Sequence, residues 1–169
     1  MEVWNKIDSF DQIQINPNTL IICDIDDTLL YFPEPITNSF KDSLESRDIE
    51  YWNKIFIKPL HTDIEGFGRL LLRLAIYNGG MCFLTARPGH NENIEFTRNN
   101  FASLKLSYEA FKVYYSWLIP KGEFIKQQIN LIGYKDIIFI DDMDYNLENV
   151  SLHFGEQIKC YKFVYKKIL

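Results

Sequence analysis

The chain has 169 residues, of which 47% are hydrophobic and 24% are charged, and its formal net charge is −5. This length suits one domain with its own core, and the composition is ordinary for a globular protein in water. No block of like charge and no tract rich in Lys or Arg occurs. This pattern argues against nonspecific binding to nucleic acid or to an anionic membrane surface. No apolar run reaches the length of a membrane span.

The N-terminal segment Met1–Asp11 has no basic stretch followed by an apolar one, so we expect no secretory signal peptide and a cytoplasmic protein. Cys23, Cys82 and Cys160 lie in apolar, strand-like segments without CxxC spacing. They are expected to be reduced thiols in the core. Cys23 adjoins an acidic cluster, but in a strand it faces away from Asp24, so it is not a candidate nucleophile.

Five short apolar runs predict strands, and helical patterns separate them along the chain. Continuous apolar strands are typical of a sheet buried on both faces, and strand–helix alternation predicts parallel βαβ units. We therefore expect an α/β fold with a parallel, Rossmann-like sheet in a single domain, residues 1–169. The predicted strands are Leu20–Asp24, Met81–Thr85, Phe111–Ser116, Ile137–Asp141 and Ile158–Tyr165. The predicted helices are Phe67–Tyr77, Asn91–Leu104 and Gly122–Ile132.

A long irregular stretch, residues 31–65, separates the first strand from the helix that leads to the second. It opens with Pro33 and Pro35 and has helical patterns near Asn38–Ser46 and Ile49–Ile57. We expect it to be a small, cap-like insert over the carboxyl edge of the sheet.

The first predicted strand ends in the acidic sequence Asp24-Ile25-Asp26-Asp27-Thr28. Alternation places Asp24 and Asp26 on one side while Ile25 points into packing. Open α/β sheets bind ligands at the carboxyl ends of their strands. A Mg²⁺ ion would offset the repulsion between these carboxylates, because hard cations prefer oxygen ligands. The alternative is that Asp26 or Asp27 caps a turn and Thr28 caps a helix.

Three further polar groups are predicted at the same edge. The second strand ends in Thr85 and is followed by Arg87, Lys121 precedes the third helix, and the fourth strand ends in Asp141-Asp142. A hydroxyl, a cation and two acidic clusters suit phosphoryl transfer. In such a site one carboxylate attacks phosphorus, Mg²⁺ and Lys hold the oxygens, and a second acid manages the leaving group.

With these motifs in this order, the chain resembles the haloacid dehalogenase (HAD) superfamily of aspartate-nucleophile phosphotransferases over about Leu20–Val150. The family's Asp-x-Asp-x-Thr motif matches residues 24–28, its Thr or Ser matches Thr85 and its Lys matches Lys121. Its closing acidic motif matches Asp141-Asp142 with Asn146. The resemblance implies a three-layer α/β/α sandwich with strand order 5-4-1-2-3.

The resemblance also implies roles for these residues in a Mg²⁺-dependent phosphomonoester hydrolase. Asp24 would form an aspartyl-phosphate, and Asp26 would be the general acid and then the general base. Mg²⁺ would be held by the Asp24 carboxylate, the Asp26 backbone carbonyl and Asp142, with Asp141 binding directly or through water. Thr85 and Lys121 would hold the phosphoryl oxygens. The substrate would be phosphorylated, with a small metabolite or nucleotide favoured.

The remaining polar residues near these motifs are expected to have supporting roles, and only Arg87 has two alternatives. Arg87 either clamps a substrate phosphate or docks against a helix. Asn146 is expected to tie the fourth loop together behind the metal ligands. Asp27 is expected to orient a turn, and Asp144 is expected to face solvent. His61, His90 and His153 show no metal-binding spacing and are expected to have ordinary roles.

Two other functions remain open. A phospho-accepting receiver module uses similar residues, but it carries its acceptor Asp on the third strand, whereas here the Asp-x-Asp comes first and an acid pair follows Lys121. A catalytically weak binding or regulatory protein with this fold is the stronger alternative, because fold analogy alone does not establish turnover.

Overall fold

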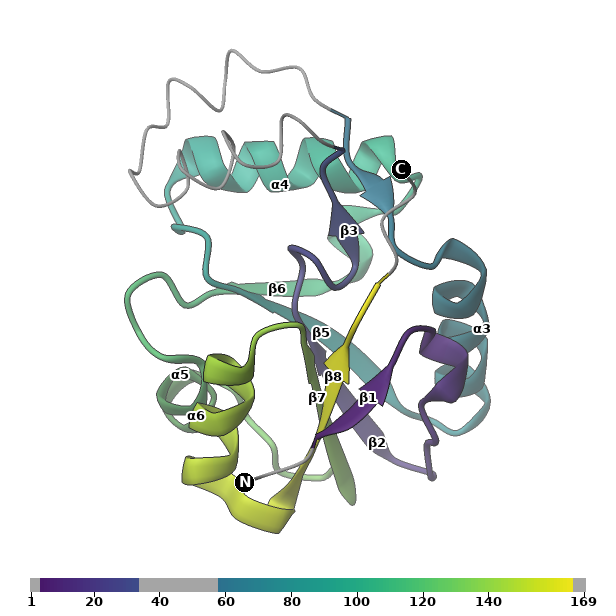
Figure 1. The fold of residues 1–169 in the computed structure, drawn as a ribbon, viewed down its shortest axis with the longest axis vertical. Coiled ribbons are helices and arrows are strands. Elements are labelled where there is room, and N and C mark those ends of the chain that lie inside the picture. Colours follow the sequence, from purple (N-terminus) through teal and green to yellow (C-terminus); the bar gives the residue numbers. More distant parts are fainter. Residues whose placement is uncertain (1–3, 34–57, 166–169) are drawn as a thin grey trace.

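The computed structural model describes residues 4–33 and 58–165. Within these residues, six strands form one parallel sheet in the order β1-β8-β7-β2-β5-β6 (Figure 1). The strands in chain order are β1 (Asn5–Ile7), β2 (Thr19–Cys23), β5 (Gly80–Thr85), β6 (Lys112–Tyr115), β7 (Asp136–Asp141) and β8 (Ile158–Phe163). The five predicted strands are β2, β5, β6, β7 and β8, so the predicted order 5-4-1-2-3 is confirmed.

The sixth strand, β1, was not predicted. It has three residues and pairs with β8 at the edge of the sheet. Asn5 and Lys6 are exposed and only Ile7 is buried, so the segment carries no hydrophobic run. Its place in the sheet depends on pairing with β8, and the sequence of β1 itself gives no sign of that pairing.

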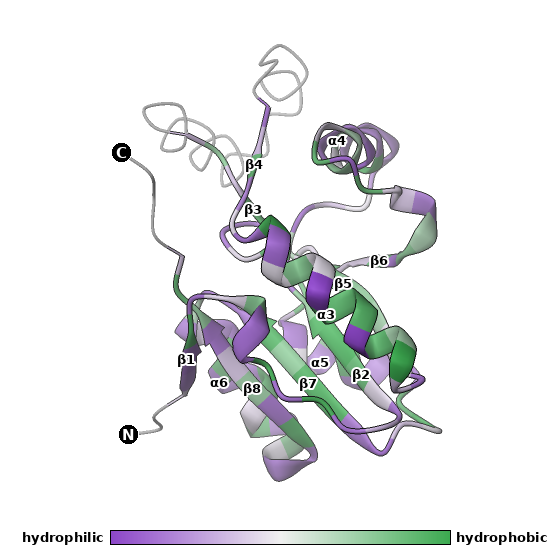
Figure 2. Ribbon diagram, turned by 90° about the vertical axis from the view of Figure 1, so that its right-hand side faces the viewer, coloured by the Kyte–Doolittle hydropathy of each residue, from purple (hydrophilic) through white to green (hydrophobic). Residues whose placement is uncertain are grey.

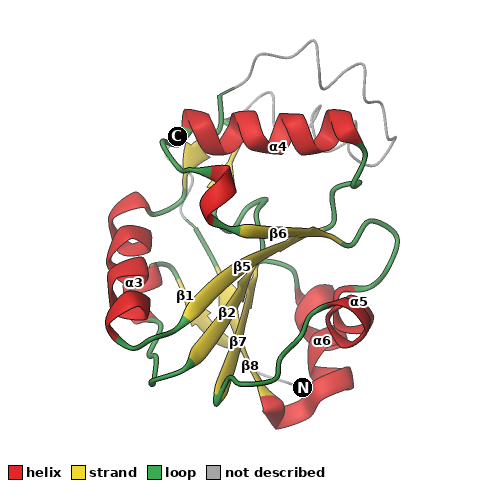
Figure 3. Ribbon diagram, turned by 180° about the vertical axis from the view of Figure 1, so that it is seen from behind, coloured by secondary structure: helices red, strands yellow, loops and turns green. Residues whose placement is uncertain are grey.

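In the described part of the chain, four helices flank the sheet and make the fold a three-layer sandwich. In Figure 3, α3 lies on one side of the sheet, α5 and α6 on the other, and α4 beyond the β6 edge. Their bounds are α3 (Ile64–Ile76), α4 (Asn91–Ser103), α5 (Lys121–Gln128) and α6 (Asp144–Phe154). The expected three-layer α/β/α architecture is therefore confirmed.

Each face of the sheet has its own hydrophobic core, and neighbouring residues of β2 alternate between the two. Ile21 and Cys23 pack on the face of α3, and Leu20 and Ile22 pack on the face of α5 and α6. The central strands are accordingly hydrophobic along their length (Figure 2). The same alternation continues past the strand, because Asp24 still donates its backbone N–H to Ile140 O at 2.9 Å. Asp24 therefore points to the face of α5.

Two predicted helices have clearly different bounds in the structure, and one helix was not predicted. Helix α3 begins at Ile64, because the Asp63 side chain accepts the N–H of Gly66 and caps its first turn. Helix α5 ends at Gln128, and Ile132 is 87% exposed beyond it. Helix α6 was missed, because its buried Leu147 and Val150 stand among polar residues of the acidic motif.

The ends of the expected insert lie side by side. Strands β3 (Leu30–Tyr31) and β4 (Leu60–His61) form an antiparallel pair in which Tyr31 faces Leu60. The helical patterns near Asn38–Ser46 and Ile49–Ile57 lie outside the described residues. Three short 3₁₀ helices complete the description: η1 (Phe10–Gln12), η2 (Tyr108–Ala110) and η3 (Gly155–Gln157).

Cys23, Cys82 and Cys160 are buried thiols that form no disulfide within the described residues, as expected. Cys23 belongs to the core on the α3 face, opposite to Asp24. None of the helices in residues 4–33 and 58–165 combines the length and apolar character needed to cross a bilayer.

Candidate active site

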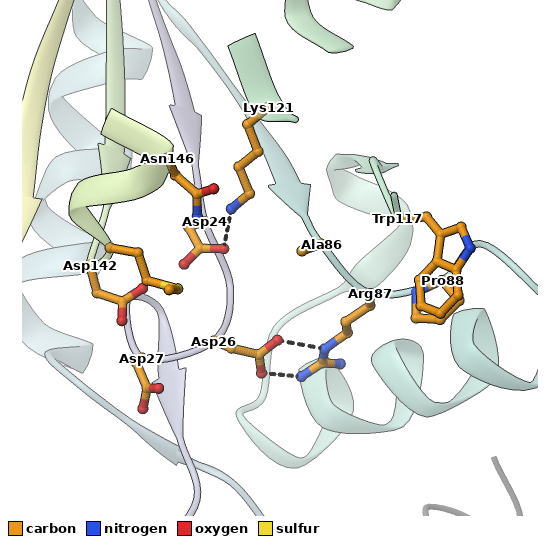
Figure 4. A pocket seen from close by; sticks show the side chains of 11 residues that line it. Asp24, Asp26, Asp27, Ala86, Arg87, Pro88, Trp117, Lys121, Asp142 and Asn146 are labelled. Carbon is orange, nitrogen blue, oxygen red and sulfur yellow. Dashed lines mark hydrogen bonds and ion pairs between the residues drawn. The ribbon is translucent and has the colours of Figure 1, made fainter. Parts of the chain in front are cut away.

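A cavity of about 500 Å³ opens at the carboxyl ends of β2, β5 and β7 (Figure 4). Most of its lining comes from the loops that follow these strands and from the loop between β6 and α5. The lining residues are Asp24, Asp26, Asp27, Ala86, Arg87, Pro88, Trp117, Lys121, Asp142, Met143 and Asn146. The structure thus brings most of the predicted site residues to one place, which is where parallel α/β sheets bind ligands.

The loop after β2 turns tightly around Ile25. Its buried backbone carbonyl accepts the N–H groups of Leu29 and Leu30 at 2.9 and 3.1 Å. Asp27 adopts the left-handed conformation with φ of 60°, which Asp tolerates better than most residues. This turn places Asp24 and Asp26 on the same cavity, as the Asp-x-Asp spacing predicted.

The Asp24 carboxylate is buried and held on both oxygens. Oδ1 accepts a hydrogen bond from Lys121 Nζ at 2.7 Å, and Oδ2 accepts one from the Thr28 hydroxyl at 3.1 Å. Burial raises the pKa of Asp24 well above its ordinary value, and neighbouring Asp141 raises it further, whereas Lys121 opposes the shift. The charge state of this carboxylate therefore depends on the cations close to it.

Lys121 is the first residue of α5 and is 2% exposed. Burial alone would lower its pKa, but the carboxylates of Asp141 and Asp24, each 2.7 Å from Nζ, raise the pKa overall. The next residue explains how α5 comes so close: a Cβ on Gly122 would lie 2.5 Å from the backbone oxygen of Asn149. The Gly122 N–H also donates to Asn149 Oδ1 at 2.7 Å, which fixes the start of α5 against α6.

Asp141 and Asp142 have different surroundings. Asp141 is fully buried, and its two oxygens accept hydrogen bonds from Lys121, the Met143 N–H and the Asn146 amide. Asp142 lines the cavity, whereas Asp141 does not. Asn146 thus ties the fourth loop together as expected, and Asp142 is the acid of the pair that faces the cavity.

Three carboxylates form a cluster suited to a metal ion. Asp24, Asp141 and Asp142 each place one carboxylate oxygen within 4.8 Å of the others. Burial, followed by the charge of Asp141, raises the pKa of Asp142 to about 7. Such a cluster of hard oxygen donors, with more negative charge than Lys121 alone offsets, fits Mg²⁺.

Asp26 forms a two-point ion pair with Arg87. Arg87 Nε and Nη2 lie 2.9 and 2.7 Å from the two carboxylate oxygens, and Nη1 donates to Thr97 and Asn100 on α4 at 3.0 and 2.8 Å. The guanidinium also lies over the Phe96 ring at 5.1 Å. Arg87 is 2% exposed, so the structure favours the docking role over the predicted phosphate clamp. Its four occupied N–H groups leave little donor capacity for a substrate.

Thr85 ends β5 and is fully buried. Its hydroxyl oxygen accepts the N–H of Arg87 at 3.2 Å, and its backbone oxygen accepts the N–H of Ser116 at 2.8 Å. Among the described residues that line the cavity, its neighbours Ala86 and Arg87 appear and Thr85 does not. Its role as a phosphate ligand stays a prediction.

Four lining residues of the cavity were not identified from the sequence: Ala86, Pro88, Trp117 and Met143, which add an apolar part to its wall. Ala86, Pro88 and Met143 directly follow motif residues, which is a signal for a wall position. Nothing local marks Trp117, because its loop reaches the cavity only through the tertiary fold. Tyr165 was also not identified; it donates its hydroxyl to Asp27 Oδ1 at 2.6 Å.

The remaining acid and the histidines have ordinary contacts. Asp144 is paired with Lys162 at 3.0 Å, and its side chain is 56% exposed. His61 Nε2 donates to the backbone oxygen of Leu104 at 2.9 Å, and His90 packs on the Trp117 ring edge-on. His153 lies 4.0 Å from Glu123.

Comparison with known proteins supports the fold and no more. Neither the protein-family models nor the curated proteins searched gave a match to the sequence. A solved structure described as "Structure of Pnkp1/Rnl/Hen1 complex" is similar with a TM-score of 0.53 and 14% sequence identity. The match covers 92% of this chain and 49% of that one, so this chain spans about half of its neighbour's length. At this identity the likeness establishes a shared α/β architecture.

Proposed function

We propose that this protein is a Mg²⁺-dependent phosphomonoester hydrolase that forms an aspartyl-phosphate on Asp24. The observation that carries the proposal is the buried Asp24 carboxylate, 2.7 Å from Lys121 and on the same cavity as Asp26. A nucleophilic carboxylate, a fixed cation and a second acid are the groups that two-step phosphoryl transfer requires. The HAD resemblance of the same residues supports the same assignment.

In the first step an Asp24 carboxylate oxygen attacks phosphorus. The bond from phosphorus to the ester oxygen breaks, and Asp26 gives its proton to that leaving oxygen, which departs as an alcohol. Lys121 stays paired with Asp24 and stabilises the charge that gathers on the phosphoryl oxygens.

In the second step Asp26, now ionised, takes a proton from a water molecule. The water oxygen attacks phosphorus, and the bond from phosphorus to Asp24 breaks. Inorganic phosphate and the free Asp24 carboxylate result, so each group returns to its starting state.

Arg87 is a positioning residue for Asp26 in this scheme. It joins Asp26 to Thr97 and Asn100 of α4 through one rigid guanidinium. A protonated Asp26 keeps one oxygen as an acceptor for Arg87 and presents the other to the leaving group. The orientation of the acid therefore depends on a residue that does not touch the substrate.

The carboxylates of Asp24 and Asp142 and the backbone carbonyl of Asp26 would hold Mg²⁺, with Asp141 binding directly or through water. When bound, the ion supplies Lewis-acid polarisation of the phosphoryl oxygens. It also favours the ionised, nucleophilic form of Asp24, whose pKa burial otherwise raises.

A catalytically weak phosphate-binding or regulatory protein is the second candidate. The observation that favours it is the two-point Asp26–Arg87 pair, which satisfies both oxygens of the acid. Such a protein would bind a phosphorylated ligand beside Lys121 without releasing phosphate.

Hydrolysis of para-nitrophenyl phosphate separates the two candidates. We expect turnover with Mg²⁺, none with a chelator, and none with Asp24→Asn in Mg²⁺. Equal background rates in all three samples would contradict the hydrolase proposal, provided that circular dichroism shows Asp24→Asn to be folded.

A further inference from the structure

The cavity has a polar and an apolar side, and the apolar side is not needed for phosphoryl transfer. We infer that the substrate's leaving group carries a flat aromatic ring, which packs on Trp117. This inference rests on the proposed function, because it identifies the class of phosphomonoester that the Asp24 site takes. The shared chemistry is a planar ring, either a nucleobase or an aryl alcohol.

Trp117 is on the short loop between β6 and α5, and Lys121 begins α5 directly after that loop. Both residues line the cavity, and Lys121 lies 2.7 Å from Asp24. In Figure 4 the Asp24–Lys121 pair and the Trp117 ring lie on opposite sides of the cavity. A phosphoryl group at Asp24 would therefore extend its leaving group toward the Trp117 side.

In Figure 4 Asp26 lies near Asp24 and extends toward Arg87, which is on the side of the Trp117 ring. It is the acid that protonates the leaving oxygen in the proposed scheme, so that oxygen must lie near it. The part of the substrate attached to that oxygen then meets Ala86, Pro88 and Trp117. Arg87 lies beside them, but its guanidinium is already bound by Asp26, Thr97 and Asn100. An extended apolar surface next to an acidic one suits a substrate with a phosphate at one end and a ring at the other.

The backbone holds the Trp117 ring at the cavity in an unusual way. Trp117 has φ of 54°, a left-handed conformation that is rare for a bulky side chain. Ser116 fixes the start of the loop through hydrogen bonds to Thr85 O at 2.8 and 3.2 Å, and Ile119 donates back to Ser116 O at 3.0 Å. The His90 ring packs edge-on at 6.4 Å between centroids. Such strained positions concentrate at ligand-binding sites.

The cavity volume also allows a ring. About 500 Å³ falls within the range of roughly 300–1,000 Å³ that small-molecule sites span. Indole offers a large flat surface on which other aromatic rings stack, and such contacts tolerate different ring chemistries. The site is therefore selective for a ring rather than for one particular ring.

Two matched substrate pairs test this inference. Adenosine monophosphate and ribose phosphate, both 5′ esters, differ by a nucleobase but release the same type of primary alcohol. Benzyl phosphate and cyclohexylmethyl phosphate differ by aromaticity and also release primary alcohols. We expect kcat/KM to favour the member with an aromatic ring, adenosine monophosphate or benzyl phosphate, in at least one pair. The preference should be about tenfold, equivalent to about 1.4 kcal/mol.

The variants are Trp117→Ala and Trp117→Phe, with Leu118→Ala as the matched control. Leu118 is on the same loop and 64% exposed, and it is not one of the described lining residues. Trp117→Ala should remove the preference by lowering kcat/KM for the aromatic substrate alone. Trp117→Phe should keep most of the preference, and Leu118→Ala should leave it unchanged.

The outcomes separate the inference from the hydrolase proposal. Preference within the nucleotide pair alone identifies a nucleobase as the source of the ring, and preference within the benzyl pair alone identifies an aryl alcohol. Hydrolysis without preference, or a preference that survives in Trp117→Ala, overturns the inference and leaves the hydrolase proposal standing.

If no substrate is hydrolysed, the hydrolase proposal fails and binding decides the inference. Isothermal titration of wild type and Trp117→Ala with adenosine monophosphate and ribose phosphate, in Mg²⁺, supplies that readout. Tighter binding of the nucleotide that depends on Trp117 supports the ring contact, and equal binding of both ligands overturns it.

Discussion

Lys121 Nζ lies 2.7 Å from Asp24 Oδ1 and 2.7 Å from Asp141 Oδ2, although 97 residues of chain separate Lys121 from Asp24. The lysine is 2% exposed and joins the start of α5 to the ends of β2 and β7. One buried charge therefore links the stability of the fold to the chemistry of the site. Removing that charge leaves the buried carboxylates of Asp24 and Asp141 without their cation, which lowers the stability of the folded protein.

Lys121→Met keeps the bulk of the side chain and removes its charge. We expect the free energy of unfolding to fall by about 3–5 kcal/mol, because breaking one side of a buried ion pair strands the other. Urea denaturation in the presence of a chelator measures this change. Phosphate release should also be lost. Lys126→Met, an exposed position on the same helix, is the control and should stay close to wild type. Unchanged stability of Lys121→Met would contradict the ion-pair account.

Arg87→Ala tests whether Arg87 acts through Asp26. With alkyl phosphates we expect kcat to fall about a hundredfold, because a poorly placed acid no longer assists a poor leaving group. With para-nitrophenyl phosphate the loss should be less than about tenfold, since that leaving group needs little protonation.

Asp26→Asn should show the same dependence on the leaving group, and Arg98→Ala on α4 should not. Arg98 pairs with Glu95 and Glu109 at the surface and has no contact with Asp26 among those described. Equal losses for both substrate types in Arg87→Ala would instead indicate the phosphate-clamp role that the sequence left open.

The stability of the metal-free protein should fall as the pH rises from about 4 to about 7. Burial and Asp141 raise the pKa of Asp142 from 3.8 to about 7, and the pKa of Asp24 is raised as well. In this window the folded protein holds protons that the unfolded chain has already released, so raising the pH favours unfolding. Because Mg²⁺ binds the ionised carboxylates, the gain in Tm on adding Mg²⁺ should grow across the same window. A gain that does not vary with pH, or that persists unchanged in Asp142→Asn, would count against the metal site.

The three thiols should be unreactive in the folded protein. Burial raises the pKa of Cys82 to about 12 and raises that of Cys23 well above its ordinary value, and Cys160 is also buried. Thiolate is the reactive form, so Ellman's reagent should label the native protein slowly at neutral pH and label all three cysteines after unfolding. Fast labelling of native protein, lost in Cys23→Ser, would show that the thiol beside Asp24 is accessible.

The sequence predicts the central sheet because each strand carries its own apolar run, and β2 illustrates this best. Its alternation also placed Asp24 and Asp26 on one side and Cys23 on the other, as the structure has them. The acidic motif that marked the end of β7 concealed α6, whose two buried apolar residues are too few to stand out. Strand β1 was missed because its partner, β8, lies at the far end of the chain.

The site was predictable where a motif lies next to its strand. Lys121 could be placed because it stands at the start of the helix that follows the third predicted strand. The role of Arg87 could not be decided, because its partners on α4 lie 10 and 13 residues further along the chain. Trp117 had no signal at all, since its conformation with φ of 54° depends on the packing of its loop.

The central claim is that Asp24 carries the phosphoryl group during turnover. Borohydride reduces an acyl phosphate to an alcohol, so quenching the enzyme during turnover with borohydride converts a phosphorylated Asp24 into homoserine. Mass spectrometry of the peptide that contains residues 20–30 should then find homoserine at position 24 only when both substrate and Mg²⁺ are present. Hydrolysis that proceeds with Asp24 unmodified under the same quench would contradict the account.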